Sequence, residues 1–177
     1  MANNVVIKSR VAAYNIDALN RTAVCAQDIE NGCIFKLENY SANEAESMVW
    51  EAKQASATDT GLWMATSPEV VIIRDAMGVE YKGLNQDPRA FVNYAGNMID
   101  ATKLMPGDII EMTAANINNA DTMDYLVPDT ADFKLTGSAS AGQGFCLHKI
   151  GTSMLHIGSS MMKDSHPVTY KYEVIKN

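Results

Sequence analysis

The sequence has no long apolar segment and is poor in cysteine, aromatic and basic residues. Its 177 residues include three cysteines, 7% aromatic residues, and 14 Lys and Arg against 21 Asp and Glu. No apolar run approaches the roughly 18 residues that a membrane-spanning helix requires. The first residues, "MANNVVIKSR", have no apolar core behind a basic start, so we expect no signal peptide. These absences predict a protein made in the cytoplasm that does not enter a membrane.

The shortage of positive charge limits the partners that we expect. The formal net charge is -7. Binding to a phosphate backbone gains affinity when Lys and Arg release counterions, and anionic membrane surfaces attract basic segments in the same way. We therefore expect neither nucleic acid nor a membrane as a partner. The odd number of cysteines (Cys25, Cys33 and Cys146) argues against a closed disulfide framework and is typical of a reducing compartment.

What the chain does contain is typical of one globular domain. Hydrophobic residues make up 47% and charged residues 20%, and the length suits a single β-rich structural domain over residues 1–177 with a sizeable core. Eleven methionines stand against four phenylalanines. Methionine adapts to irregular spaces, so we favour core filling over a role at a contact surface.

Short alternating segments between turn signals dominate the chain. They predict nine or ten strands, and hence a mainly β fold, an antiparallel sandwich or barrel with one or two short helices. In the last segment, "VTYKYEVIKN", Tyr170, Tyr172 and Val174 share one face. The other expected strands cover residues 5–13, 70–74, 79–84, 97–105 and 109–113 and the segments "MDYLVP", "DFKLTGSA" and "GFCLHKIGTSMLHIG".

The segment "TAVCAQDIENGCIFKLE" predicts a hairpin. Asn31 and Gly32 suit a two-residue type I′ turn, in which both central residues have positive φ. This register places Cys25 and Cys33 on opposite faces, so they cannot form a disulfide. The expected core face consists of Val24, Ala26, Cys33, Phe35 and Leu37.

Two segments carry helix signals. Asn43 and Glu46 resemble a capping box for a helix over residues 43–52, although "MVWEA" suits a strand equally well. Asp87 followed by Pro88 predicts a second helix that ends near Gly96. By contrast, residues 70–73 are apolar on both faces, which predicts a central strand.

The stretch "KLMPGDIIEMT" poses the question of whether Asp108 is reactive. Pro106 and Gly107 suit the two central positions of a type II turn. No His or Lys partner for Asp108 is adjacent in the sequence. We therefore predict that Asp108 ends a turn and that residues 109–113 return as a strand.

No motif in the sequence predicts a catalytic, cofactor-binding or metal-binding residue, and we expect that the protein is not an enzyme. Cys146 and His148 lie two residues apart on one face of an expected strand, and His156 would share that face if the strand continued. These three are too few for a zinc site, which needs about four ligands. "SASAGQGF" lacks the Gly-Lys-Ser/Thr of a phosphate loop, and no Gly-x-Ser-x-Gly occurs. A hydrolase using His148 or His156 stays a minor alternative. The acidic residues of "ENYSANEAE" suit a solvated face: Glu38, Glu44 and Glu46.

Aromatic residues offer one binding hypothesis. Trp50 and Trp63 flank the polar loop of residues 56–61. With Tyr40 they would form a platform for a carbohydrate or another small ligand. Burial of both tryptophans in the core is the interpretation that we favour.

Three stretches together resemble a family of small virion proteins of tailed bacteriophages, the head decoration or auxiliary capsid type. They are "NNVVIKSRVAAYNIDALNRTAVCAQDIENGCIFKL", "LWMATSPEVV" and "AGNMIDATKLMPGDIIEMT". The resemblance rests most on one ordered pattern. It begins with Ala95-Gly96, continues through an expected strand, and ends with Lys103-Leu104 and Gly107-Asp108.

The resemblance implies a non-catalytic, β-rich homo-oligomer, commonly a trimer, without a cofactor. It implies that the protein binds the major capsid protein and lies on the capsid surface of the virion after synthesis in the host cytoplasm. A tail-tube or other virion subunit is one alternative, and a carbohydrate- or ligand-binding β-sandwich module is another.

Overall fold

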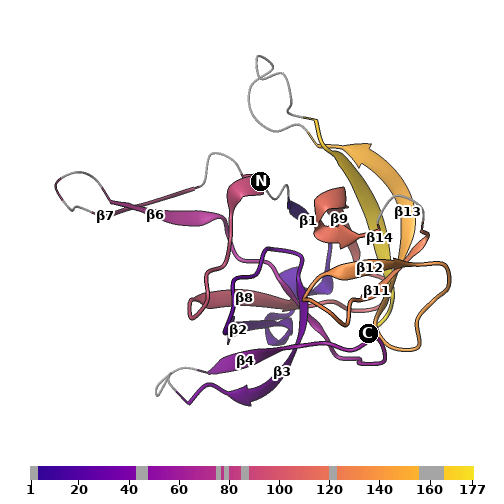
Figure 1. Ribbon diagram of the computed structural model, residues 1–177, viewed down its shortest axis with the longest axis horizontal. Coiled ribbons are helices and arrows are strands. Elements are labelled where there is room, and N and C mark those ends of the chain that lie inside the picture. The colour runs from indigo at the N-terminus through magenta and orange to yellow at the C-terminus, as the bar shows by residue number, and fades with distance from the viewer. Residues whose placement is uncertain are drawn as a thin grey trace.

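The computed structural model describes residues 4–42, 48–74, 77, 80–84, 88–119, 123–155 and 166–177. Within them the chain is mainly β, as predicted (Figure 1). The strands are β1 Val6–Arg10, β2 Asn20–Val24, β3 Ile34–Tyr40, β4 Val49–Gln54, β5 Trp63–Ala65, β6 Val70–Arg74, β7 Glu80–Leu84, β8 Met98–Lys103, β9 Ile109–Thr113, β10 Ile117–Asn118, β11 Tyr125–Pro128, β12 Leu135–Ser138, β13 Cys146–Met154 and β14 Val168–Lys176. The helical elements are three-residue 3₁₀ turns: η1 Ala12–Tyr14, η2 Asp17–Leu19, η3 Pro88–Ala90 and η4 Ala114–Asn116.

The strands form three units. A seven-stranded sheet has the order β1-β9-β14-β13-β11-β12-β10, a closed barrel has the order β2-β4-β3-β5-β8, and β6 pairs with β7 alone. Only the pairs β2–β4 and β10–β12 are parallel among the described strands. No helix in the described part of the chain is long and apolar enough to cross a membrane.

Strand β5 and the first two residues of β3 are buried on both faces, because they separate two apolar cores. Ile34 and Met64 pack in the core shared with the seven-stranded sheet, which includes Tyr172 of β14. The neighbouring residues Phe35 and Trp63 belong to the core inside the barrel. Successive side chains of a strand point to opposite faces, so these short strands join the barrel to the sheet.

The last strand matches its expectation. Tyr170, Tyr172 and Val174 are buried, whereas Lys171 and Glu173 between them are partly exposed. The buried residues belong to the core between sheet and barrel. The alternation therefore predicted which face of β14 is buried.

The hairpin expected around Asn31 and Gly32 is wrong. β2 pairs with β4 and β8, and β3 pairs with β4 and β5. A turn is present, since the Cys33 N–H donates to Glu30 O at 3.2 Å, but Gly32 has φ +90° while Asn31 does not have positive φ. The turn therefore does not have type I′ geometry, which brings two strands into a hairpin.

The expected inner face of β2 is wrong by one residue. Ala23 and Cys25 are buried, whereas Val24 is partly exposed and Ala26 is exposed. Cys25 and Cys33 lie in one core cluster and not on opposite faces, and both are free thiols.

The helix predictions also need correction. Residues 49–54 form strand β4, so the strand alternative holds there. The capping residues Asn43 and Glu46 lie outside the described residues, as does Asp87. After it, Pro88–Ala90 forms a single 3₁₀ turn and not a helix to Gly96. Pairing with β2 and β3 places β4 in the closed barrel and buries Ala52 in its core, and this tertiary context overrides the helix-like pattern.

The central strand expected at Val70–Arg74 is wrong as well. This strand, β6, pairs only with β7 in register Val70 opposite Leu84, and the hairpin extends away from the remainder of the molecule (Figure 1). The hairpin itself was predicted. Its apolar sequence is not used in either sheet of the described chain.

The turn at residues 105–108 is confirmed. Gly107 has φ +91°, and the Asp108 N–H donates to Met105 O at 2.9 Å. The Asp108 carboxylate is buried and accepts from the Met105 N–H at 2.7 Å and from the Ala12 N–H at 2.9 Å. Asp108 thus closes its own turn and also holds the segment that leads from β1 to β2.

We predict that Asp108→Ala destabilises the fold by about 2–4 kcal/mol, because two backbone N–H groups lose their buried acceptor. Urea unfolding monitored by circular dichroism measures the change. Asp108→Asn is the matched control, since it keeps one acceptor oxygen and should cost less. A loss below about 0.5 kcal/mol for Asp108→Ala would contradict this role of the carboxylate.

The cysteines generate a second prediction. Cys25, Cys33 and Cys146 are buried, and burial raises the pKa of the Cys33 thiol from 9.0 to about 12. Since the thiolate is the reactive form, a thiol reagent at pH 8 should label none of the three rapidly before unfolding and all three in urea. Rapid labelling of the folded protein would contradict this burial.

The raised pKa of Cys33 also predicts how stability depends on pH. Between pH 9 and about 12 the unfolded state loses the Cys33 proton more readily, so the free energy of unfolding should fall as pH rises.

Candidate interaction surfaces on the barrel

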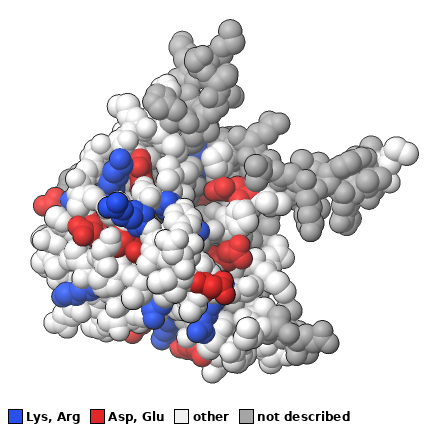
Figure 2. Space-filling view, turned by 180° about the vertical axis from the view of Figure 1, so that it is seen from behind, with Lys and Arg blue, Asp and Glu red and all other residues white. Residues whose placement is uncertain are grey.

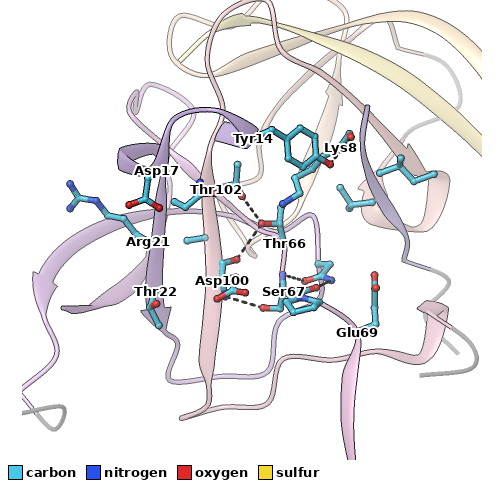
Figure 3. Close-up of a pocket in the computed structure, with 16 residues that line it drawn as sticks. Lys8, Tyr14, Asp17, Arg21, Thr22, Thr66, Ser67, Glu69, Asp100 and Thr102 are labelled. Atoms are coloured by element: carbon cyan, nitrogen blue, oxygen red, sulfur yellow. Dashed lines mark hydrogen bonds between the residues drawn. The ribbon is translucent and has the colours of Figure 1, made fainter. Parts of the chain in front are cut away.

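A polar groove of about 730 Å³ runs between β1 and the outside of the barrel (Figure 3). Val6 to Lys8 of β1 form one wall. The remainder is formed by residues of β2 and β8, the segment before β6, and Tyr14, Asp17 and Asn31. The charged groups that line it are of both signs: Lys8, Arg21, Asp17, Glu69 and Asp100.

Hydrogen bonds fix the floor of this groove. The hydroxyls of Thr66 and Thr102 lie 2.6 Å apart, and the Asp100 N–H donates to Ser67 Oγ at 3.0 Å (Figure 3). Buried Asn31 accepts from the Ser67 N–H at 3.1 Å and donates to Ser67 O at 2.8 Å. These groups hold the segment before β6 against β8, so their polar atoms are engaged in structural bonds.

A second hollow of about 490 Å³ is lined by residues of η2, β2, β4 and β8, the end of β3 and the residue before β4. Four of its residues, Tyr40, Met48, Trp50 and Met98, define what we call the aromatic–methionine patch. The exposed fractions of Tyr40, Met48 and Met98 are 56%, 78% and 57%. An irregularity in β3 between Leu37 and Tyr40 sets Tyr40 opposite Trp50, and the two ring centroids lie 4.3 Å apart.

Arg21 links this patch to the barrel interior. Its guanidinium carbon lies 4.6 Å from the ring centre of Trp50 and 5.3 Å from that of Trp63. The Lys103 amine lies 5.9 Å from the Trp63 ring centre. Trp63 is 6% exposed, so it is a core residue as expected, whereas Trp50 is partly exposed. The surface available to a partner therefore contains Tyr40 and Trp50 but not Trp63.

The candidate metal ligands Cys146 and His148 do not form part of a metal-binding cluster among the described residues. Cys146 is buried beside an irregularity in β13, and His148 lies against Tyr125 with ring centres 5.1 Å apart. His156 lies outside the described residues. The described residues contain no group of three metal-ligating side chains.

Glu38, from the acidic stretch, pairs with Lys36 at 3.2 Å, while Glu44 and Glu46 lie outside the described residues. On the face shown in Figure 2, acidic and basic side chains are intermixed and separated by uncharged surface. This face offers no extended area of one sign for a charged polymer.

The chain matches no protein-family model, no curated protein and no solved structure in the three comparisons.

The sequence signalled part of the patch. The sequence hypothesis of a platform made by Trp50, Trp63 and Tyr40 includes two of its residues. It does not include Arg21, Met48 or Met98. Met98 reaches the site because β8 pairs with β2, and Arg21 because β2 also pairs with β4. These pairings join residues that are distant in the sequence, so no local pattern indicates them.

We predict that Arg21→Ala shifts tryptophan emission and lowers stability by about 1 kcal/mol, since two cation–π contacts are lost. Intrinsic fluorescence during urea unfolding reports both effects, because Trp50 and Trp63 are the two tryptophans of the chain. Arg10→Ala, at the exposed end of β1, is the matched control. An Arg21→Ala spectrum identical to that of the unmodified protein would contradict the contact.

Proposed function

We propose that this chain is a non-catalytic structural protein of a bacteriophage particle, a head decoration protein that binds the lattice of the major capsid protein. The proposal joins the resemblance of its sequence to decoration proteins with the aromatic–methionine patch. In this proposal the protein is a homo-oligomer on the capsid surface, and it needs no cofactor, nucleic acid or membrane.

The aromatic–methionine patch is the observation that carries the proposal. Aromatic residues, Met and Arg are enriched at protein–protein interfaces, while Lys, Glu and Asp are depleted. Tyr40, Trp50, Met48 and Met98 with adjacent Arg21 have this composition. Contiguous exposed apolar side chains mark interaction sites, and those of the patch line one hollow.

A repeated lattice explains why such a modest patch suffices. Each copy would contribute a few apolar contacts, and linked copies of an oligomer bind with higher avidity than one copy alone.

Quantitative peptide mass spectrometry of purified particles tests the proposal. We expect a copy number close to that of the major capsid protein. A ratio typical of a tail would favour the tail-tube alternative. Absence from particles would refute a structural role in the virion.

A charge in the patch should weaken attachment. We predict that Met98→Glu reduces binding to shells that lack this protein by at least about tenfold, because an unpaired carboxylate would be desolvated in an apolar contact. Co-sedimentation with such shells measures the affinity. Met154→Glu is the matched control, since Met154 is 64% exposed at the end of β13, away from the patch. Equal binding by both variants would exclude the patch as the attachment surface.

A carbohydrate-binding module is the second candidate, and the exposed Tyr40–Trp50 pair favours it. Aromatic faces bind the apolar faces of sugars, and this pair lines an open hollow. A glycan array probed at high protein concentration tests it. Binding that Trp50→Ala abolishes would support this function, and no binding to any glycan would remove it.

A further inference from the structure

Strand β1 is an open edge of the seven-stranded sheet. It pairs with β9, and no strand of the described chain lies on its other side. Val5 faces β9, because its carbonyl accepts from the Thr113 N–H at 3.1 Å and its N–H donates to Thr113 Oγ1 at 3.0 Å. Alternate residues of an antiparallel strand direct their backbone groups to opposite sides. Val6 and Lys8 therefore direct theirs to the open edge.

One contact confirms this direction and leaves the edge accessible. The carbonyl of Lys8 accepts from the Tyr14 hydroxyl at 2.9 Å, and Tyr14 is 63% exposed. Val6, Ile7 and Lys8 line the polar groove, so space lies beside the backbone of β1. The hydroxyl of an exposed side chain can be displaced by the N–H group of an added strand.

The hairpin β6–β7 is the complementary element. Its strands have five residues each, as β1 has, and neither pairs with another strand of the described chain. An isolated two-stranded hairpin is at best marginally stable in water, and a third strand stabilises it. Its sequence, Val-Val-Ile-Ile in β6, is that of a strand within a sheet.

The β6–β7 hairpin begins beside the open edge of β1. Glu69, the residue before β6, lines the groove together with Val6 to Lys8. Two copies brought together at this site could therefore each offer the hairpin to the other, which gives a closed assembly and not an open fibre.

We propose that the open edge of β1 binds the β6–β7 hairpin of a second copy of this chain. The added hairpin extends the seven-stranded sheet across the subunit boundary by strand addition. This contact would supply the homo-oligomer of the proposed function. Attachment to a capsid is measured separately, so self-association and shell binding can each fail without the other.

A proline at position 8 tests whether the open edge of β1 binds the added hairpin. Lys8→Pro removes an N–H that faces the open edge and leaves the bonds between β1 and β9 in place, as proline does in edge strands. We expect it to weaken self-association by at least about tenfold, because the added strand loses a hydrogen bond and meets the ring. Lys8→Ala keeps the N–H and should associate as the unmodified chain does. Analytical ultracentrifugation over a concentration series measures both.

Removal of the β6–β7 hairpin tests whether the hairpin is the strand that is added. Val70 and Leu84 are cross-strand partners, so two glycines can replace residues 70–84 without moving the chain ends apart. This variant should self-associate more weakly than the unmodified chain, as Lys8→Pro should. Mixed with Lys8→Pro, which retains its hairpin, it should form a 1:1 heterodimer through one joint, and a misfolded variant could not do so.

Native mass spectrometry of the mixture, with one variant isotope-labelled, detects this pair. The proposal is overturned if the unmodified chain stays monomeric at the highest concentration reached. It is equally overturned if both variants associate as strongly as the unmodified chain, or if both are folded monomers that form no mixed pair.

Discussion

The carboxylate of Asp108 holds the point where the chain passes between barrel and sheet. The turn from β8 to β9 leaves the barrel, and the segment after β1 enters it. One carboxylate accepts the N–H of Met105 in the first connection and of Ala12 in the second. The backbone of the same residue accepts from Val174 of β14 at 2.9 Å. Three segments far apart in the sequence thus depend on one buried acid, whose burial without these donors would be costly.

This junction leaves two parts of the surface free for partners. Because β5 and the start of β3 are buried on both faces, one side of the barrel is covered by the sheet. Tyr40 and Met98 of the aromatic–methionine patch and the open edge of β1 remain exposed. One surface is apolar and suits a protein of different sequence, while the other presents backbone groups and suits a strand. A subunit with both could join copies of itself and also attach to a lattice.

Local patterns predicted what local forces determine. The alternation in β14, the limits of β9 and the type II turn before it follow from side-chain period and from the φ preferences of proline and glycine. The partner of each strand did not follow. β2 pairs with β4 and β8 because those pairings bury Ala23 and Ile99 together inside the barrel, and burial over long distances leaves no periodic signal. Arg21 could not be predicted for the same reason. Its contacts with the rings of Trp50 and Trp63 form only when the fold brings these two residues together.

The central claim is that the aromatic–methionine patch faces the shell protein of a bacteriophage particle. Its most direct test places a photo-crosslinking amino acid at position 40 in the protein of intact particles, with position 154 as the reference site, followed by mass spectrometry of the adducts. The account predicts adducts between position 40 and the major capsid protein, and few or none from position 154. Adducts of position 40 with solvent alone, or equal yields at both positions, would contradict it.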